Sequence, residues 1–428
     1  MQIFSMVIRW IVRGIVVIGI VSTLYIALNS GDDKPTDDIE FRDIRVKPSD
    51  EDNAYLGLIA MTQALKQWPE KNEYPGKLTP ERVHELLTAN ADALGLFHTI
   101  AMRPVWFENP KTDVTKISVP FTPFVWIMRL QRLKIEELIA KGDIHAATED
   151  IKDTIRFLST IMSGADELTV FSVTLNMCDS TSLLAMKAAS SEKATEEDML
   201  QLLESVRNVP PILIPSFKQV SCRTYSKIFS PGVDIVLNKS RRGSFRRKNF
   251  QRYAFKPNRT KALYIKEMQE AITISENDFS REEWKAFETR QEQAMPITRN
   301  LLVPNIMGRA MAQALTPDYG NIVEKITLLK TRMAFAEIVI AAERMRLRTG
   351  KNPDGLAALV PDYLPAVPLD PFNRGMALKY DSAKRMVYTV GPEGTFNPAT
   401  TEISRIRDYV RYSVTLGGLA QTENNSER

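Results

Sequence analysis

The most distinct feature of the hydrophobic pattern is an uncharged apolar run near the amino terminus, from Gly14 to Leu28. As a helix, this run is about 22 Å long at 1.5 Å per residue, which is short of a bilayer. Extension back to Trp10 adds Arg13, whose long side chain can reach the headgroups, and gives about 28 Å against a hydrocarbon core of about 30 Å. The pattern therefore predicts a transmembrane anchor within residues 1–30.

The charges on either side of this run predict its orientation. Arg9 and Arg13 precede the run, whereas Asp32 and Asp33 follow it. The positive-inside rule then places the amino terminus in the cytoplasm and the body outside it, with a single pass through the inner (cytoplasmic) membrane. A cleaved signal peptide and a soluble helix remain alternatives, although no clean pair of small residues marks a cleavage site around Ala27.

Helical periodicity dominates the next part of the chain. Residues 31–48 are acidic and proline-bearing, which is typical of a linker, and residues 49–318 are predicted to form a helical body. Two helices meet at Gly142-Asp143 within Phe121–Ser163, which predicts an αα-hairpin with the glycine as a left-handed cap.

The starts of two further helices are predicted from capping residues. Ser49 with Asp52 is typical of a capped start for a helix to about Trp68, and Thr79-Pro80 is typical of another start. Other helices are predicted by periodicity over residues 166–189, 195–207, 260–276, 280–295 and 319–349.

After Gly350 the pattern changes, because five prolines within 19 residues prevent a continuous helix. Two short strands, Ala377–Tyr380 and Met386–Val390, flank a polar turn and predict a β-hairpin. Residues 319–414 are thus predicted as a long helix followed by a small α+β module, and residues 415–428 as a disordered tail. The predicted fold class is mainly α.

The segment from the end of the long helix through the hairpin resembles the carboxy-terminal part of the major pseudopilins of bacterial type II secretion. The resemblance covers about 60 residues and rests on Pro353, Leu356, Tyr363-Leu364-Pro365, Asp370-Pro371-Phe372, Tyr380, Tyr388 and the close from Gly391 to Gly394. It implies a long helix, a proline-rich loop and a short sheet. Glu393 stands where that family has Asp, so the calcium site of some pseudopilins is not implied.

The layout of the whole chain resembles a different group, uncharacterised membrane-anchored bacterial proteins that are mostly helical and end in such a module. Those proteins also show a motif like Asn53-Ala54-Tyr55 and a Gly-Asp hairpin, here Gly142-Asp143. The resemblance implies the architecture and no activity.

Composition is that of an ordinary globular protein, with 44% hydrophobic and 25% charged residues. This excludes a polytopic transporter, a fully disordered chain and a collagen-like fibre. The two cysteines can pair in an oxidising compartment, although the apolar helical context of Cys178 favours a buried free thiol.

The common catalytic motifs are absent from the sequence, including the G-x-S-x-G elbow, the phosphate-binding loop, H-E-x-x-H and the dinucleotide fingerprint. The spacing of Glu81 and His84 matches half of a di-iron motif, and the sequence has no second copy of it. A capping or solvated role is therefore predicted for these two residues, and the same role is predicted for His145. His98 is expected to be partly buried, and Asp370 to form a turn. No cofactor, metal ion or catalytic residue is predicted.

The net charge of +4 conceals one strongly basic segment, residues 239–261, which has ten basic residues and no acid. Aromatic residues alternate with its cations, which suits contact with an anionic surface. The alternative is a solvated loop that packs its aromatic side chains on the body. The predicted surface-binding residues are Arg241, Arg242, Phe245, Arg246, Arg247, Lys248, Arg252 and Tyr253.

These observations predict a membrane-anchored, extracytoplasmic, non-enzymatic binding or scaffold protein of the cell envelope. Its predicted partners are the membrane and an anionic lipid, an acidic envelope polymer or a protein, and nucleic acid is not expected outside the cytoplasm. Two alternatives stay open. One is an accessory component of a type II secretion or pilus-like assembly, and the other is an envelope hydrolase of an unfamiliar type.

Overall fold

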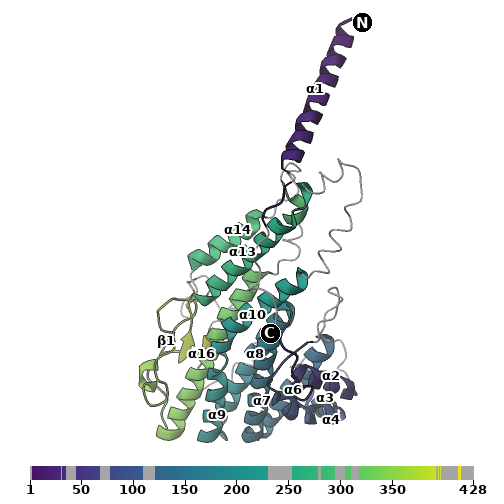
Figure 1. Cartoon of the computed structure of the whole chain (residues 1–428). Helices are drawn as coiled ribbons and strands as arrows, with labels where there is room; N and C mark the ends of the chain where they lie inside the picture. The colour runs from purple at the N-terminus through teal and green to yellow at the C-terminus, as the bar shows by residue number, and fades with distance from the viewer. Residues whose placement is uncertain are drawn as a thin grey trace. The chain divides into compact units, whose positions relative to one another are not determined.

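The computed structural model consists mainly of helices, with one small sheet near the carboxy terminus (Figure 1). The predicted mainly α fold is confirmed. The structure describes residues 2–29, 31–34, 45–67, 78–108, 121–229, 253–277, 281–294, 304–309, 318–391, 394, 396 and 413–415. The chain divides into two compact units, which are Met1–Arg42, Tyr225–Glu270 and Phe287–Tyr319 for the first, and Asp43–Thr224, Ala271–Ala286 and Gly320–Arg428 for the second.

Aromatic side chains pack together in the first unit. The rings of Tyr225, Phe229 and Tyr264 lie with centroids within 5.9 Å of one another. Burial raises the pKa of Tyr264 to about 12. The carboxylate of Asp32 accepts hydrogen bonds from the backbone N–H groups of Asn258 and Arg259, at the start of helix α13 (Pro257–Glu276). A carboxylate at this position satisfies free N–H groups and interacts favourably with the helix dipole.

Helix α1 (Gln2–Leu28) also belongs to the first unit, and its side chains are described from Ile15 onward. Large apolar side chains along it are 41% to 83% exposed, namely Ile15, Val16, Val17, Ile18, Ile20, Val21, Leu24, Tyr25 and Leu28. Within the described part of the chain, no helix is both long and apolar enough to cross a membrane. The predicted transmembrane helix is therefore not supported by the described residues.

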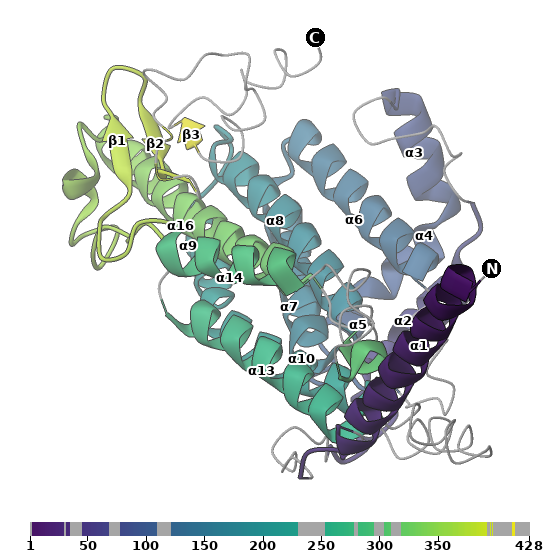
Figure 2. The ribbon, with the colours of Figure 1, turned by 90° about the horizontal axis from the view of Figure 1, so that it is seen from above.

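The second unit is organised around the predicted αα-hairpin, which is confirmed. Helix α6 (Phe121–Lys141) ends at Gly142, whose φ of +74° is the left-handed conformation that glycine adopts without strain. Asp143 then caps helix α7 (Ile144–Gly164) by accepting from the N–H of Ala146. The apolar stripe of α7 is buried, and helix α8 (Leu168–Ala189) packs beside it (Figure 2).

Shorter helices cover one side of this hairpin. They are α2 (Ala54–Ala64), α3 (Pro80–Ala89), α4 (Ala91–Gly95) and α5 (Phe97–Ala101). Thr79 caps α3 as predicted. The predicted start at Ser49 is wrong, because Ser49 and Asp52 bond to each other in the preceding turn and Asn53 is the cap of α2. This helix also ends before the predicted Trp68.

Further helices follow along the chain, and they are α9 (Glu196–Arg207), α10 (Pro210–Ile228), α14 (Arg281–Ala294) and α16 (Tyr319–Thr349). Thr195 and Asp198 form a complete capping box at the start of α9. Ion pairs hold α16 against its neighbours, since Arg332 pairs with Asp179 of α8 at 2.9 Å and Arg344 pairs with Glu196 of α9 at 2.7 Å.

The carboxy-terminal module follows α16 with a short 3-10 helix, Leu356–Leu359, and the predicted hairpin. Strands β1 (Lys379–Asp381) and β2 (Met386–Tyr388) pair antiparallel, so the hairpin is confirmed. A third strand, β3 (Ser413–Thr415), pairs with β2 and was not expected from the sequence. Buried Asp370 accepts hydrogen bonds from the N–H groups of Phe372 and Val390, which agrees with its predicted role in a turn.

Candidate functional site

The predicted anionic-surface site lies almost entirely outside the described residues. This applies to seven of its members, Arg241, Arg242, Phe245, Arg246, Arg247, Lys248 and Arg252. The eighth, Tyr253, is 1% exposed and its ring packs edge-on against Tyr25 with a centroid distance of 6.1 Å. Burial and the neighbouring Tyr25 raise the pKa of Tyr253. The aromatic ring of Tyr253 therefore packs within the first unit and is not available to an external surface.

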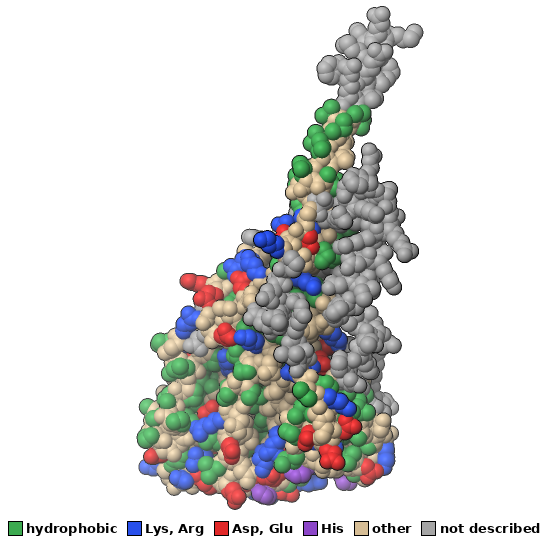
Figure 3. Space-filling model, viewed as in Figure 1, with side chains coloured by type: hydrophobic (Ala, Val, Ile, Leu, Met, Phe, Trp, Pro, Cys, Tyr) green, Lys and Arg blue, Asp and Glu red, His purple; other side chains and the backbone are tan. Residues whose placement is uncertain are grey.

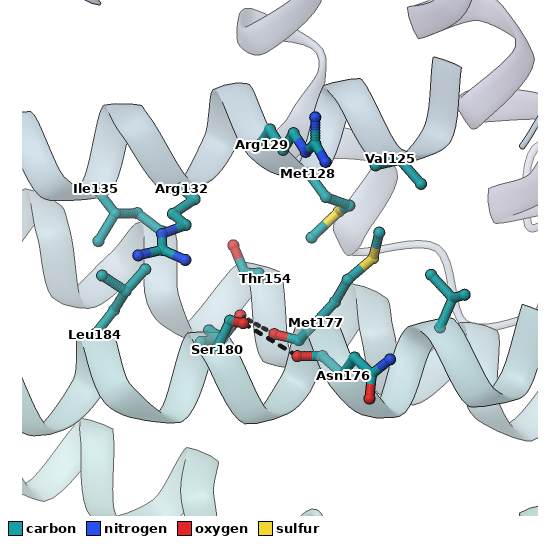
Figure 4. A pocket seen from close by; sticks show the side chains of 12 residues that line it. Val125, Met128, Arg129, Arg132, Ile135, Thr154, Asn176, Met177, Ser180 and Leu184 are labelled. Carbon is teal, nitrogen blue, oxygen red and sulfur yellow. Dashed lines mark hydrogen bonds between the residues drawn. The ribbon is translucent and has the colours of Figure 1, made fainter. Parts of the chain in front are cut away.

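The second unit contains a groove with a volume of about 460 Å³ (Figure 4). Helix α6 forms one wall, α8 forms the other, and Thr154 of α7 lines the space between them. Helix α6 contributes Val125, Met128, Arg129, Arg132 and Ile135, which follow helical spacing. Helix α8 contributes Val173, Asn176, Met177, Ser180, Thr181 and Leu184.

Hydroxyl groups in the groove are engaged with the backbone of their own helices. Thr154 donates to the carbonyl of Asp150 at 2.7 Å, Thr181 to that of Met177 at 2.9 Å, and Ser180 to that of Asn176 at 3.1 Å. Such bonds to the carbonyl four residues earlier occupy the hydroxyl proton. These side chains therefore expose mainly methyl groups and methylenes toward the groove.

The only charges among the lining residues are the two arginines of α6. Arg132 pairs with Glu136 one turn further along α6, at 2.8 Å. The guanidinium of Arg129 lies 4.6 Å from the ring centroid of Trp126, and within the described residues no carboxylate is in ion-pair distance of it. Figure 4 shows Arg132 directed toward the opposite wall, between Ile135 and Met128. The groove is thus apolar and positively charged.

Sequence reasoning placed these residues on helices but not in a site. Their spacing on α6 and α8 is ordinary amphipathic periodicity, which says nothing about which two helices face each other. The one available signal was that two arginines interrupt the apolar face of α6, at 129 and 132.

The three histidines lie at the surface, each beside a carboxylate from another helix, and Figure 3 shows histidine side chains gathered along its lower edge. His84 lies 3.5 Å from Glu137, His145 lies 3.1 Å from Asp198, and His98 pairs with Asp153. The solvated roles predicted for His84 and His145 agree with this exposure. The expected partial burial of His98 is wrong, because its side chain is 70% exposed although its partner is buried.

His145 gives a testable link between pH and stability. Its hydrogen bond to Asp198, together with the negative charge of that residue, raises the pKa of His145 above 6.5. The stabilisation is complete below pH 6.5, where both folded and unfolded forms are protonated, and is lost as the pH rises through the raised pKa. We expect the thermal midpoint of the wild-type chain to fall between pH 6 and pH 9 by more than that of His145→Gln. Equal slopes in circular dichroism melts would contradict this, and His84→Gln is the matched surface control.

A buried polar cluster lies at the corner between α7 and α8. Arg45 donates to the carbonyl of Gly164 at 3.0 Å and pairs with Asp166. Glu108 is fully buried and accepts from the indole of Trp106 at 3.0 Å and from the backbone of Asp166. Burial, followed by the negative charge of Glu108, raises the pKa of Asp166 to about 6, although Arg45 and Arg223 oppose the shift. We call Arg45, Glu108, Asp166 and Arg223 the Asp166 cluster.

The Asp166 cluster brings two carboxylates together, which is one requirement of the hydrolase hypothesis. The other requirement was a histidine in the same cleft, and all three histidines lie elsewhere at the surface. The arginines bond backbone carbonyls and side chains at the corner, since Arg223 donates to the carbonyls of Ser163 and Ala165. The geometry is that of a structural clamp.

Metal and thiol chemistry find little support in the described part of the chain. No group of three or more histidine, cysteine or acidic side chains lies close enough there to hold a metal ion. Cys178 is a buried free thiol, as predicted, and burial raises its pKa. The pKa of Glu81 is lowered by backbone and Thr79 hydrogen bonds at the start of α3, in agreement with its predicted capping role.

Comparisons with protein-family models, with curated proteins and with solved structures found no match to this chain. The resemblance to pseudopilins and to membrane-anchored helical proteins therefore stays a prediction.

Proposed function

We propose that this protein is a non-enzymatic binding or scaffold protein of the cell envelope. In this proposal α1 anchors it in the inner membrane, the remainder lies outside the cytoplasm, and the groove between α6 and α8 holds its partner. The observation that carries the proposal is the chemistry of the groove. Its lining residues offer apolar surface and two guanidinium groups but no acid, histidine or thiol, and its hydroxyls are bonded to backbone. Such a lining is typical of a binding site.

Two features support the membrane location. The uncharged run from Gly14 to Leu28 carries large apolar side chains that are exposed, and contiguous exposed apolar surface is typical of a site that meets lipid or another protein. The basic segment 239–261 supplies cations for an anionic membrane surface, where an exposed cation contributes about 1 kcal/mol. Anionic lipid is thus a partner that suits both the segment and the groove.

The test is photo-crosslinking of the full chain in its native membrane. The photoreactive residue p-benzoylphenylalanine replaces Val173, which lines the groove, and the matched control carries it at Leu200, which is 46% exposed on α9. Membranes are washed with sodium carbonate before irradiation, and adducts are mapped by mass spectrometry. We expect the chain to stay in the washed membranes and the Val173 position alone to give a defined adduct.

Each part of the proposal has its own contrary result. Release of the chain by carbonate would contradict the anchor. The absence of any adduct at Val173, or equal labelling at Val173 and Leu200, would contradict a binding role for the groove.

A further inference from the structure

The chemistry of the groove defines the class of ligand, and this inference rests on the proposed function. Its apolar residues form two facing rows, with Val125, Met128 and Ile135 on α6 and Val173, Met177 and Leu184 on α8. From residue 125 to 135 a helix rises about 15 Å, and from 173 to 184 it rises about 16 Å. The apolar space is therefore elongated, which suits a linear hydrocarbon chain.

The size of the groove favours a small ligand over a protein segment. A volume of about 460 Å³ lies within the range of roughly 300 to 1,000 Å³ that small-molecule sites occupy. A stable protein partner instead covers about 800 Å² on each side, over some 20 to 30 residues. Both walls include a methionine, whose flexible side chain adapts to chains of different shape.

The charge of the groove identifies the polar end of the ligand. Arg129 and Arg132 lie one turn apart on the same wall, and no acidic residue lines the space. Planar guanidinium groups bind carboxylates through two parallel hydrogen bonds. The existing partner of Arg132 is a residue of the same exposed helix surface, Glu136, and such surface pairs contribute little energy that a ligand would have to replace.

We infer that the groove binds a single-chain lipid carboxylate, such as a free long-chain fatty acid. The acyl chain lies between the apolar rows of α6 and α8, and the carboxylate bonds to Arg129 and Arg132. This occupant satisfies both the apolar walls and the two guanidinium groups of the lining.

The probe is a palmitic acid analogue that carries a diazirine on its chain and an alkyne for detection. It is added to the full chain reconstituted in nanodiscs of neutral phosphatidylcholine, irradiated, and located by mass spectrometry of the labelled peptides. We expect labels in peptides covering 125–135 and 173–184, and competition by unlabelled palmitate but not by inorganic phosphate. The corresponding fatty alcohol, which lacks the charge, is expected to label about tenfold less.

Three variants separate the contributions of charge and shape. Arg129→Gln/Arg132→Gln is expected to reduce labelling about tenfold, because it removes both guanidinium groups. Ser180→Trp places a bulky ring at the middle of the α8 wall, which fills the groove, and is expected to abolish labelling of its peptides. Arg82→Gln removes an arginine that lies outside the groove and pairs with Glu85 on α3, and it is expected to label as the wild type does. Circular dichroism melts verify that each variant is folded.

Several results would overturn the inference. They are equal labelling by the acid and the alcohol, unchanged labelling of the double arginine variant, and labels spread over peptides outside the groove. If the crosslinker at Val173 captures a segment of a protein while the fatty acid does not label the groove, this inference fails and the proposed binding function stands. If neither probe gives an adduct, both fail.

Discussion

Replacing Gly164 by alanine should lower the free energy of unfolding by about 3 kcal/mol, which corresponds to a fall in the thermal midpoint of roughly 3 to 5 °C for a chain of this size. Gly164 is the last residue of α7, and a methyl group on it would overlap the backbone carbonyl and the Cβ atom of Trp106. The obstacle is mainly backbone, which cannot move aside as the end of a flexible side chain can. Trp106 is 2% exposed and packs on Phe157, so its displacement disturbs the core.

The matched control for this substitution is Gly95→Ala. Gly95 ends α4, and nothing lies within 4 Å of the position that its methyl group would take. There the change should be neutral or stabilising by up to about 1 kcal/mol, because alanine favours helix over glycine. Thermal unfolding of both variants by circular dichroism decides the matter, and similar midpoints for the two would contradict the close approach at Gly164.

Replacing Asp166 by asparagine should remove much of the pH dependence of stability between pH 4 and pH 6. Because the pKa of Asp166 is raised to about 6, the folded protein holds a proton that the unfolded chain, with a pKa of 3.8, has released. Stability from this residue is therefore greatest below pH 3.8 and declines as the pH rises to about 6. The two values differ by about 2.2 pH units, so the loss amounts to about 3 kcal/mol.

The measurement is urea unfolding of the full chain at several pH values. Asp166→Asn should match the wild type near pH 4 and exceed it in stability at pH 7.5, because the amide carries no buried charge. Asp354→Asn, at an exposed position, should keep the wild-type profile. If Asp166→Asn is less stable than the wild type at pH 7.5, the attraction to Arg45 outweighs the cost of burial and this account of the cluster is wrong.

Local features of the fold were predictable from the sequence because their causes are local. The cap at Thr195 and the turn at Gly142-Asp143 depend on residues within one turn of each other, and both form as expected. Helix α10 was missed because Pro210, Pro211 and Pro215 argue against helix. Its first two prolines occupy the first turn, where no N–H is needed, and burial of residues such as Phe217 overrides the third.

Long-range features could not be predicted in this way. Arg45 and Asp166 are 121 positions apart, and nothing in the neighbourhood of either residue indicates that they meet. The groove depends on α6 and α8 lying on the same side of α7, which is a property of packing and not of either helix alone. The third strand was missed for the same reason, since β3 joins the hairpin from 25 residues beyond β2.

The clamp formed by Arg45 has a mechanical consequence. A force on the chain before residue 45 reaches Arg45 before it reaches α2. The guanidinium of Arg45 passes part of this force to Gly164 and Asp166. A force that would otherwise act on the start of α2 alone is therefore shared with the corner between the longer helices α7 and α8. The chain that enters the second unit is thus fastened at the corner between α7 and α8 as well as at the start of α2.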